Sequence, residues 1–205
     1  MYHPPMLAPL RVPGIRASLA LEPATLLSLL LAILVHASAA GSAIIEPSKT
    51  EPTNMELKSQ AFTAGHPIPS RHTCDGQDAS PPLSWSEPPG GTRSFALVSD
   101  DPDAPGGMWV HWVVWNIPAS ARALAESLPK KESLPDGTKQ GTTDFGRIGY
   151  GGPCPPSGTH RYFFKLYALD TTLVLPASTT KEDLERAMRG HILAQPELMG
   201  TYKRR

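Results

Sequence analysis

Proline and glycine constrain this chain more than any other feature of its sequence. The 205 residues include 23 prolines and 17 glycines, and many of them stand in short clusters between apolar runs. Proline has no backbone N–H to donate and its ring clashes with the preceding helical turn, so it is excluded from helix interiors and from central strands. The clusters therefore mark turns, and the pattern predicts a loop-rich, mainly β protein rather than a helical bundle.

The apolar runs between these turns predict the strands. Met55–Ser59 alternates like an opening strand, and Ser94–Val98 is a short apolar run. Val110–Ile117 is a longer run, and Arg161–Leu169 is rich in aromatic residues, which favours a buried strand. A chain of this length accommodates one ordinary domain with tails, and it can bury a substantial core.

One segment has the pattern of a helix. Thr179 and Glu182 have the spacing of a capping box, in which the two residues satisfy each other's backbone N–H groups. Apolar residues then follow at fourfold spacing: Leu184, Met188 and Ile192. We expect a helix over residues 180–194, near the C-terminus, and we expect Pro196 to end or kink it.

Residues 1–39 have the composition of a secretory signal peptide. Arg11 and Arg16 precede an apolar run at residues 26–35, and an Ala-Ser-Ala exit follows at residues 37–39. A basic segment, a short apolar core and a small-residue exit are typical of a cleaved export signal. The apolar run is shorter than the roughly 20 residues that span a bilayer. An uncleaved N-terminal membrane anchor is the alternative.

Cleavage after Ala39 would leave an exported protein, either periplasmic or secreted. Residues 40–53 would then form a short disordered lead-in, since they contain prolines and charged residues and offer little to bury. We expect the globular domain over residues 54–205, and we do not expect it to be transmembrane.

The charge balance excludes one class of partner. The 19 basic and 19 acidic residues give a formal net charge of zero. The basic run at Lys203–Arg205 is three residues long and terminal, so the electrostatic footprint of a nucleic-acid-binding protein is missing from the sequence.

Two stretches carry candidate functional residues. The first, D-D-P-D-A-P at residues 100–105, crowds three carboxylates into a proline-stiffened turn, and W-V-H-W-V-V-W-N at residues 109–116 then places a histidine between tryptophans. Because side chains alternate along a strand, we expect Trp109, His111 and Val113 to share one face. The other face would carry the intervening residues: Val110, Trp112 and Val114.

The second stretch is G-Y-G-G-P-C-P-P at residues 149–156, followed by S-G-T-H-R-Y at residues 157–162. Its glycines allow close backbone approach, its prolines stiffen the loop, and His160 and Tyr162 lie on one face of the strand that follows. Histidine and tyrosine donors that converge with backbone N–H groups would form a pocket for a small anion.

The two stretches together resemble the phosphatidylethanolamine-binding protein family, also called Raf kinase inhibitor proteins. The blocks that carry the resemblance are D-P-D-A-P…W-V-H-W and G-G-P-C-P-P…H-R-Y, in this order and at this separation. S-P-P-L-S-W at residues 80–85 and A-Q-P-E-L-M-G-T-Y at residues 194–202 resemble the prokaryotic branch. The resemblance covers about residues 54–202, which is nearly the whole expected domain.

The resemblance implies a Greek-key fold of two β-sheets with a small anion pocket near one end. It implies that the ligand is phosphate, a carboxylate or a phosphoethanolamine head group, bound without a cofactor. It also suggests a role as regulator or inhibitor of a protein partner. Eight residues fall on the family's pocket positions or on the loop that lines the pocket: Asp101, Asp103, Trp109, His111, Gly152, Cys154, His160 and Tyr162.

Each of these residues also has a purely structural explanation. Asp101 and Asp103 would close a turn through Asx hydrogen bonds, and His111 would be a packed core histidine. The functional alternative is a metal- or Cys/His-dependent hydrolytic enzyme that uses the same pocket, with Cys154 beside His160. The sequence contains neither H-E-x-x-H nor G-x-S-x-G, so we expect a binding protein rather than an enzyme.

Cys74 and Cys154 are the two cysteines of the chain. An even number of cysteines in an exported protein favours a disulfide, and here each cysteine lies beside a proline-rich turn. We expect a bridge that braces the pocket wall, with two separate thiols as the alternative.

Overall fold

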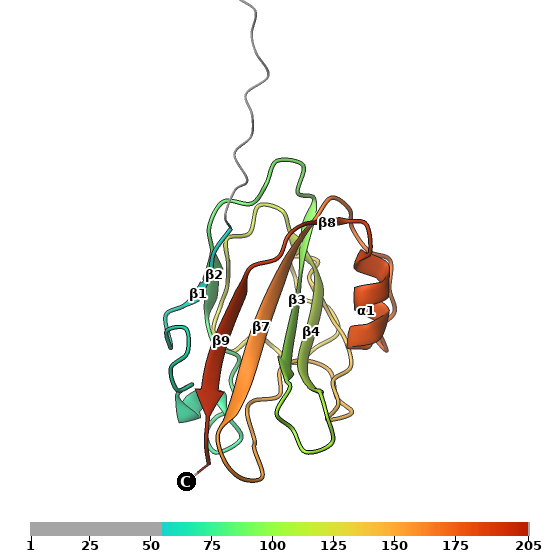
Figure 1. Ribbon diagram of the computed structural model, residues 1–205. Helices are drawn as coiled ribbons and strands as arrows, with labels where there is room; N and C mark the ends of the chain where they lie inside the picture. The colour runs from blue at the N-terminus through green and yellow to red at the C-terminus, as the bar shows by residue number, and fades with distance from the viewer. Residues whose placement is uncertain (1–54, 205) are drawn as a thin grey trace, which may run out of the picture. The chain divides into compact units, whose positions relative to one another are not determined.

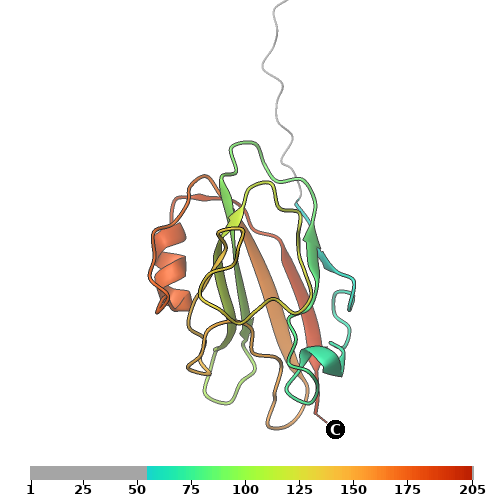
Figure 2. The same ribbon diagram turned by 180° about the vertical axis from the view of Figure 1, so that it is seen from behind.

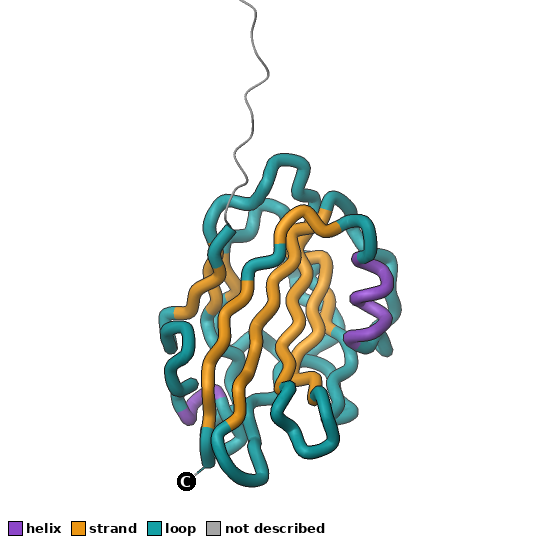
Figure 3. Tube along the Cα trace, viewed as in Figure 1, coloured by secondary structure: helices purple, strands orange, loops and turns teal. Residues whose placement is uncertain are grey.

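The computed structural model describes residues 55–204. Over that range the chain contains one α-helix, α1 (Lys181–Met188), and a short 3-10 helix, η1 (Ser70–His72). The rest is strand and loop, as Figure 3 shows. The strands are β1 (Leu57–Ser59), β2 (Leu83–Trp85), β3 (Ser94–Asp101), β4 (Trp109–Pro118), β5 (Ala123–Leu124), β6 (Lys139–Gln140), β7 (His160–Leu169), β8 (Ile192–Ala194) and β9 (Glu197–Tyr202).

The strands form two antiparallel sheets (Figure 1). The small sheet has the order β1-β2-β5. The large sheet has the order β6-β4-β3-β7, and both β8 and β9 pair with β7, at opposite ends of that strand. The mainly β, two-sheet fold with a helix near the C-terminus, which we predicted from the sequence, is confirmed.

β3 is the central strand of the large sheet, and all of its residues are buried. Leu97 on one face packs in a core that includes Leu57 of the small sheet. Val98 on the other face packs in a second core that includes Leu184 of α1. Because side chains alternate, a strand covered on both faces needs apolar residues at successive positions, as at residues 95–98 in the middle of β3. Figure 2 shows the long loops between β4 and β7 crossing in front of the sheet, with α1 beside it.

A β-bulge displaces His111 from the regular alternation of β4. Ser99 of β3 pairs with Trp112, whereas Asp100 pairs with Val110, so His111 is the extra residue on β4. Trp112 consequently packs in the core shared with the small sheet, and Val110 packs in the core beside α1. The alternation that we predicted across His111 is therefore wrong. Bulges are common next to functional sites, because they redirect a side chain.

The helix begins one residue later than the predicted capping box. Thr180 is the N-cap, and its side chain accepts a hydrogen bond from the backbone N–H of Asp183. The carboxylate of Asp183 accepts in return from the backbone N–H of Thr180, at 3.3 Å. The hydroxyl of Thr179 instead donates to the carbonyl of Pro176, at 2.6 Å. The predicted pair, Thr179 and Glu182, has the correct spacing, but each of its residues lies one position before the residue that forms the capping box.

The helix also ends earlier than the predicted residue 194. Gly190 has a φ of +81°, a conformation that glycine adopts without steric cost, and the chain leaves the helical path there. Ile192–Ala194 forms β8, whose pairing with β7 outweighs the fourfold apolar spacing. Pro196 therefore separates β8 from β9 rather than ending a helix.

The predicted signal peptide (residues 1–39) and lead-in (residues 40–53) lie outside the described residues. Within residues 55–204, no helix has both the length and the apolar character needed to cross a bilayer.

Candidate functional site

The two sequence motifs meet at one end of the large sheet. The loop from β3 to β4 and the loop that precedes β7 both lie at the end of the sheet where the C-terminus lies (Figure 1). They enclose a cavity of about 320 Å³. Its lining residues are Asp101, Ala104, Pro105, Gly106, Trp109, His111, Phe145, Cys154, Pro155, Pro156 and His160. Of the predicted site residues, Asp103, Gly152 and Tyr162 do not line it.

Asp101 and His160 form a buried pair at the inner end of this cavity. Nδ1 of His160 lies 2.7 Å from Oδ2 of Asp101. Because a carboxylate only accepts, Nδ1 carries the hydrogen and Nε2 is left for other partners. The other oxygen of Asp101 accepts from the backbone N–H of Asp103, at 2.8 Å. Asp101 thus closes the turn, as the structural explanation requires, and at the same time orients His160.

His111 is oriented by the backbone of the second motif. Its Nδ1 donates to the carbonyl of Gly151, at 2.6 Å, and its side chain is buried, so Nε2 again remains for other partners. Burial disfavours the imidazolium and lowers the pKa of His111, and this outweighs the opposite effects of Gly151, Asp101, Asp100 and Asp144. In the ligand-free protein this ring is therefore neutral near pH 7.

Tyr162 lies behind the two histidines. Its ring contacts His111 edge-on at 5.1 Å between centroids and stacks with His160 at 6.5 Å. Its hydroxyl is buried and has no hydrogen-bond partner within the described part of the chain. Burial, and after it the negative charge of Asp101, raises the pKa of Tyr162. The phenol consequently stays protonated and can donate a hydrogen bond.

Asp103 and Gly152 are turned away from the cavity. The carboxylate of Asp103 accepts from the side chain of Arg161 at 2.6 and 2.9 Å, and from its backbone N–H at 2.9 Å. Arg161 lowers the pKa of Asp103 to about 2, so this carboxylate is charged but neutralised by its partner. The backbone N–H of Gly152 donates to Asp78 at 2.6 Å and is not directed at a ligand.

The predicted disulfide between Cys74 and Cys154 is confirmed, with their Cα atoms 5.4 Å apart. Cys154 lines the cavity next to Pro155. The backbone N–H of Cys74 also donates to the carbonyl of Pro153, at 3.1 Å. The bridge therefore holds the wall of the cavity against the segment that follows η1, and it consumes the thiol that a cysteine hydrolase would use.

Two residues of the site were missed by the sequence analysis. Asp78 accepts from Lys130 at 2.5 Å and from Arg147 at 3.0 Å, in addition to Gly152, and so clamps the second motif. Phe145 forms a side wall, edge-on to Trp109 at 5.5 Å between centroids. Neither residue stands inside a motif, and the proximity of Phe145 to the second motif in sequence was the one available signal.

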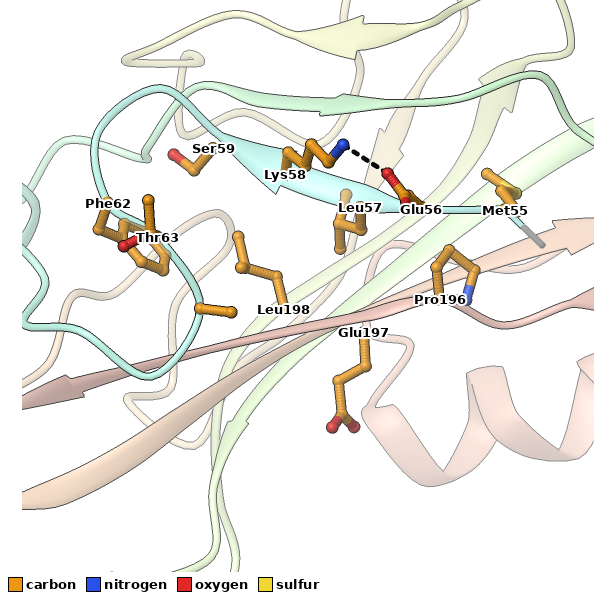
Figure 4. Close-up of a pocket in the computed structure, with 11 residues that line it drawn as sticks. Met55, Glu56, Leu57, Lys58, Ser59, Phe62, Thr63, Pro196, Glu197 and Leu198 are labelled. Atoms are coloured by element: carbon orange, nitrogen blue, oxygen red, sulfur yellow. Dashed lines mark ion pairs between the residues drawn. The ribbon is translucent and has the colours of Figure 1, made fainter.

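A larger groove, of about 520 Å³, lies between β1 and β9 and is shown in Figure 4. Leu57 and Leu198, which line it, belong to the core between the sheets. Glu56 and Lys58 form an ion pair at its rim (Figure 4). Its lining contains no histidine. The cavity beside the histidines is therefore the better candidate site.

The chemistry of the candidate site follows from its two imidazoles. Both rings have Nδ1 fixed by a partner, and both line the cavity. Nε2 accepts a hydrogen bond when the ring is neutral and donates one when the ring is protonated. Within residues 55–204, no group of three or more His, Cys, Asp or Glu side chains is arranged to hold a metal ion.

Comparisons with known proteins agree with the fold and with the motifs. The model of the phosphatidylethanolamine-binding protein family matches residues 58–203. A UPF0098 protein of Methanothermobacter thermautotrophicus is 55% identical over 150 residues, which are 73% of this chain and 99% of that protein. A UPF0098 protein of Aquifex aeolicus is 52% identical over 153 residues, which are 73% of this chain and 89% of that protein.

Two solved structures are similar as well. A phosphatidylethanolamine-binding protein homolog from Chlamydia trachomatis has a TM-score of 0.68 and 44% identity, and the match covers 74% of this chain and 98% of that one. E. coli YbcL, a member of the mammalian phosphatidylethanolamine-binding protein family, has a TM-score of 0.69 and 34% identity. The match covers 74% of this chain and 99% of that one.

Proposed function

This chain belongs to the phosphatidylethanolamine-binding protein family, and from that premise we propose that its cavity binds a small anion between His111 and His160. The ligand would be phosphate, a carboxylate or a phosphoethanolamine head group. The observation that carries the proposal is the fixed orientation of both rings, each with Nδ1 held by a partner on the protein. An oxygen anion placed in the cavity would meet both Nε2 atoms.

For electrostatic reasons, binding of the anion should be accompanied by protonation of a histidine. Asp101 lies at the inner end of the cavity, so an anion is attracted only if at least one imidazole is charged. The pKa of ligand-free His111 is lowered by burial, and a bound anion would raise it again by stabilising the imidazolium. Anion affinity should therefore increase as the pH falls below about 6.5, the ordinary value for histidine.

We propose an exported protein that regulates or inhibits a protein partner, with the pocket as its recognition element. The sequence of residues 1–39 supports export, and so does the disulfide, which persists in oxidising compartments. Binding is preferred over Cys/His-dependent hydrolysis because Cys154, the nucleophile that this form of the alternative would use, is held in the disulfide.

The test is calorimetric titration of phosphate and of phosphoethanolamine at about pH 6 into wild type and His160→Ala. Removing one charge-assisted hydrogen bond, worth about 1.5–3 kcal/mol, should weaken binding tenfold or more.

A matched control is His191→Ala. His191 also has its Nδ1 2.7 Å from a carboxylate, that of Asp170, but it is exposed and does not line the cavity. This variant should bind like wild type. Equal affinities for wild type and His160→Ala, or no binding of either ligand by wild type, would refute the assignment.

A further inference from the structure

We propose that Asp78 is a positioning residue of the anion site, and that it acts on His111 through the single peptide group that joins Gly151 to Gly152. Asp78 does not line the cavity, so its effect would reach a ligand only through the histidine. The inference rests on the proposed function, because His111 is one of the two rings to which we assign the anion.

The peptide group between Gly151 and Gly152 is held on both sides. Its carbonyl oxygen, on Gly151, accepts from Nδ1 of His111 at 2.6 Å, and its N–H, on Gly152, donates to Oδ1 of Asp78 at 2.6 Å. In a trans peptide these two groups point in opposite directions. Asp78 and His111 therefore lie on opposite sides of one planar unit. We call Asp78, this peptide and His111 the relay.

Glycine on both sides of the peptide lets its partners come close. A Cβ at Gly152 would lie 2.5 Å from the carbonyl oxygen of His72 and 2.8 Å from Cα of Thr73. A Cβ at Gly151 would lie 2.6 Å from the ring of Phe145. Real Cβ atoms do not approach other atoms so closely, so a side chain at either position would force the main chain to shift and would disturb the relay.

The backbone of Asp78 is set for this contact. Its φ is +52°, a left-handed conformation that aspartate and asparagine adopt more readily than other non-glycine residues. Its two carboxylate oxygens have different partners. Oδ1 accepts from Gly152, whereas Oδ2 accepts from Lys130 at 2.5 Å and from Arg147 at 3.0 Å. The oxygen that faces the peptide is therefore fixed by contacts on the other oxygen as well as by the main chain.

The charge of Asp78 is compensated by residues that do not line the cavity. One carboxylate faces two cations, Lys130 and Arg147, so the three side chains together carry one formal positive charge. A carboxylate with no such partners would repel an anion in the cavity. Asp78 can instead polarise the peptide without adding net negative charge beside the site.

A carboxylate bound to a peptide N–H strengthens the acceptor at the other end of that peptide. Hydrogen bonds in a chain polarise one another, by roughly 10–30% per bond. The carbonyl of Gly151 therefore holds the Nδ1–H of His111 more firmly, which fixes the tautomer and makes Nε2 more basic. His160 receives the same effect directly from Asp101. Each histidine of the site is thus coupled to a carboxylate, one directly and the other through a peptide.

The first test is NMR of the isotopically labelled, ligand-free protein with its disulfide intact, and Asp78→Asn is the variant. Asparagine keeps an oxygen for Gly152 and tolerates the positive φ, but it removes the charge. The Nδ1–H proton of His111 is assigned by its loss in His111→Gln. In Asp78→Asn this proton should move upfield and His111 should titrate at a lower pH, while His160 titrates as in wild type. An unchanged His111 would overturn the proposal.

Lys130→Gln separates the relay from a simple clamp on the loop. It leaves Asp78 in place and removes one of the two cations that compensate its charge, at a side chain that is 35% exposed. The relay predicts that the Nδ1–H proton of His111 moves downfield, opposite to its shift in Asp78→Asn. A clamp would be loosened by both substitutions. Upfield shifts in both variants would therefore show that Asp78 only holds the loop.

Both variants leave the other groups around His111 in place: Asp100, Asp101, Asp144, Phe145, His160 and Tyr162. Asp75→Asn is the matched control for the lost charge. Asp75 belongs to the same loop as Asp78, but it is bonded to Tyr202 and Arg204. This control should leave His111 unchanged. A shift equal to that of Asp78→Asn would show a general effect of charge and would contradict the relay.

Calorimetric titration of phosphate at about pH 6 connects the relay with binding. Replacing a carboxylate that is bonded to a metal-binding histidine weakens metal affinity about 10–100-fold, and a peptide transmits part of that effect, so Asp78→Asn should weaken phosphate binding about threefold to tenfold. Direct electrostatics alone predicts tighter binding, because the substitution removes an anion.

The two measurements distinguish a failure of the relay from a failure of the proposed function. Equal or tighter phosphate binding by Asp78→Asn would overturn the relay and leave the proposed function standing, since wild type would still bind. Failure of wild type to bind phosphate would remove the proposed function, and with it the part of Asp78 in binding. The NMR shifts are recorded without ligand, so they report on the coupling of Asp78 to His111 in either case.

Discussion

At the scale of single residues, the candidate site depends on how the protein fixes its two histidines. His111 is the extra residue of a β-bulge, and its Nδ1 donates to the backbone carbonyl of Gly151. His160 begins β7 and donates to a carboxylate, that of Asp101. The two rings therefore present the same nitrogen to the cavity through different partners. Because Nδ1 of each ring is committed to its partner, a bound ligand acts on the protonation of Nε2.

We expect the ligand-free protein to lose stability as the pH falls through about 6.5, in part because of His111. Burial lowers the pKa of His111 in the folded protein, so the unfolded chain binds this proton more readily. The contribution is complete above the unfolded pKa and is lost as the pH falls toward the folded one. His111→Gln has no such proton to bind, so its free energy of unfolding should change less between about pH 7.5 and 5.5.

Urea unfolding at several pH values measures both proteins, with His191→Gln as a control at the exposed histidine. Equal pH dependence in wild type and His111→Gln would contradict the assignment. The burial of His111 would then have no effect on its proton affinity.

At the scale of elements, neighbouring carboxylates of β3 connect the candidate site with α1. Asp101 orients His160, whereas Asp100 points to the opposite face and is fully buried. There Asp100 accepts from Lys165 of β7 at 2.9 Å and from Lys181 of α1 at 2.6 Å. Since one carboxylate compensates two ammonium groups, the packing of α1 against the sheet depends on Asp100 more than on either lysine.

We expect Asp100→Asn to destabilise the protein by about 3–5 kcal/mol, because it leaves the ammonium group of Lys165 without its carboxylate partner and that of Lys181 with only the exposed Glu185, 3.8 Å away. Lys181→Met should cost less, since Asp100 keeps its pair with Lys165 and the methionine can pack in the same space. Chemical denaturation of both variants gives the two free energies. A loss for Lys181→Met that equals or exceeds the loss for Asp100→Asn would show that the lysine of α1, rather than the shared carboxylate, is the critical partner.

The elements also show where sequence reasoning succeeds. The long strands β3, β4 and β7 were found within a few residues of their ends, because apolar runs between turn residues depend on local sequence. The bulge at His111 was missed because register is set by pairing with a distant strand. Ile192–Ala194 was assigned to the helix for the same reason, since its pairing with β7 is a long-range interaction that the fourfold spacing does not report.

At the scale of the whole molecule, the fold brings together motifs that are separated in sequence. Asp101 and His160 are 59 residues apart, and their place in one pocket was predicted through the family resemblance that the two motifs carry. Asp78 and Phe145 were not predictable, because one acts through a backbone N–H and the other through its place beside Gly151. Asp103, Gly152 and Tyr162, which do not line the cavity, have local partners instead. Asp103 is bonded to Arg161, the N–H of Gly152 donates to Asp78, and Tyr162 packs against His111 and His160.

The disulfide connects the structure of the described domain with the predicted route of the whole chain. Cys74 and Cys154 close a segment with a sequence separation of 80. In the chain-entropy account, a loop of that length stabilises the folded state by roughly 4 kcal/mol. The bond forms and persists in an oxidising compartment, whereas most cytosols keep cysteines reduced as free thiols. Oxidation of this protein should therefore depend on its export.

We expect the protein isolated from its native host to begin near Ala40 and to contain no reactive thiol after denaturation without reductant. Replacing Leu30 by arginine would place a charge in the middle of the apolar run at residues 26–35, which an export signal does not tolerate. The Leu30→Arg chain should keep its N-terminus, stay in the cytosol and titrate two thiols. Val174→Arg is the control, since it adds the same charge at a fully exposed position of the domain and should be exported and oxidised like wild type. N-terminal sequencing and thiol titration of the three proteins decide the matter. An intact N-terminus in soluble wild type would contradict the signal assignment, and an intact membrane-bound chain would establish the anchor instead.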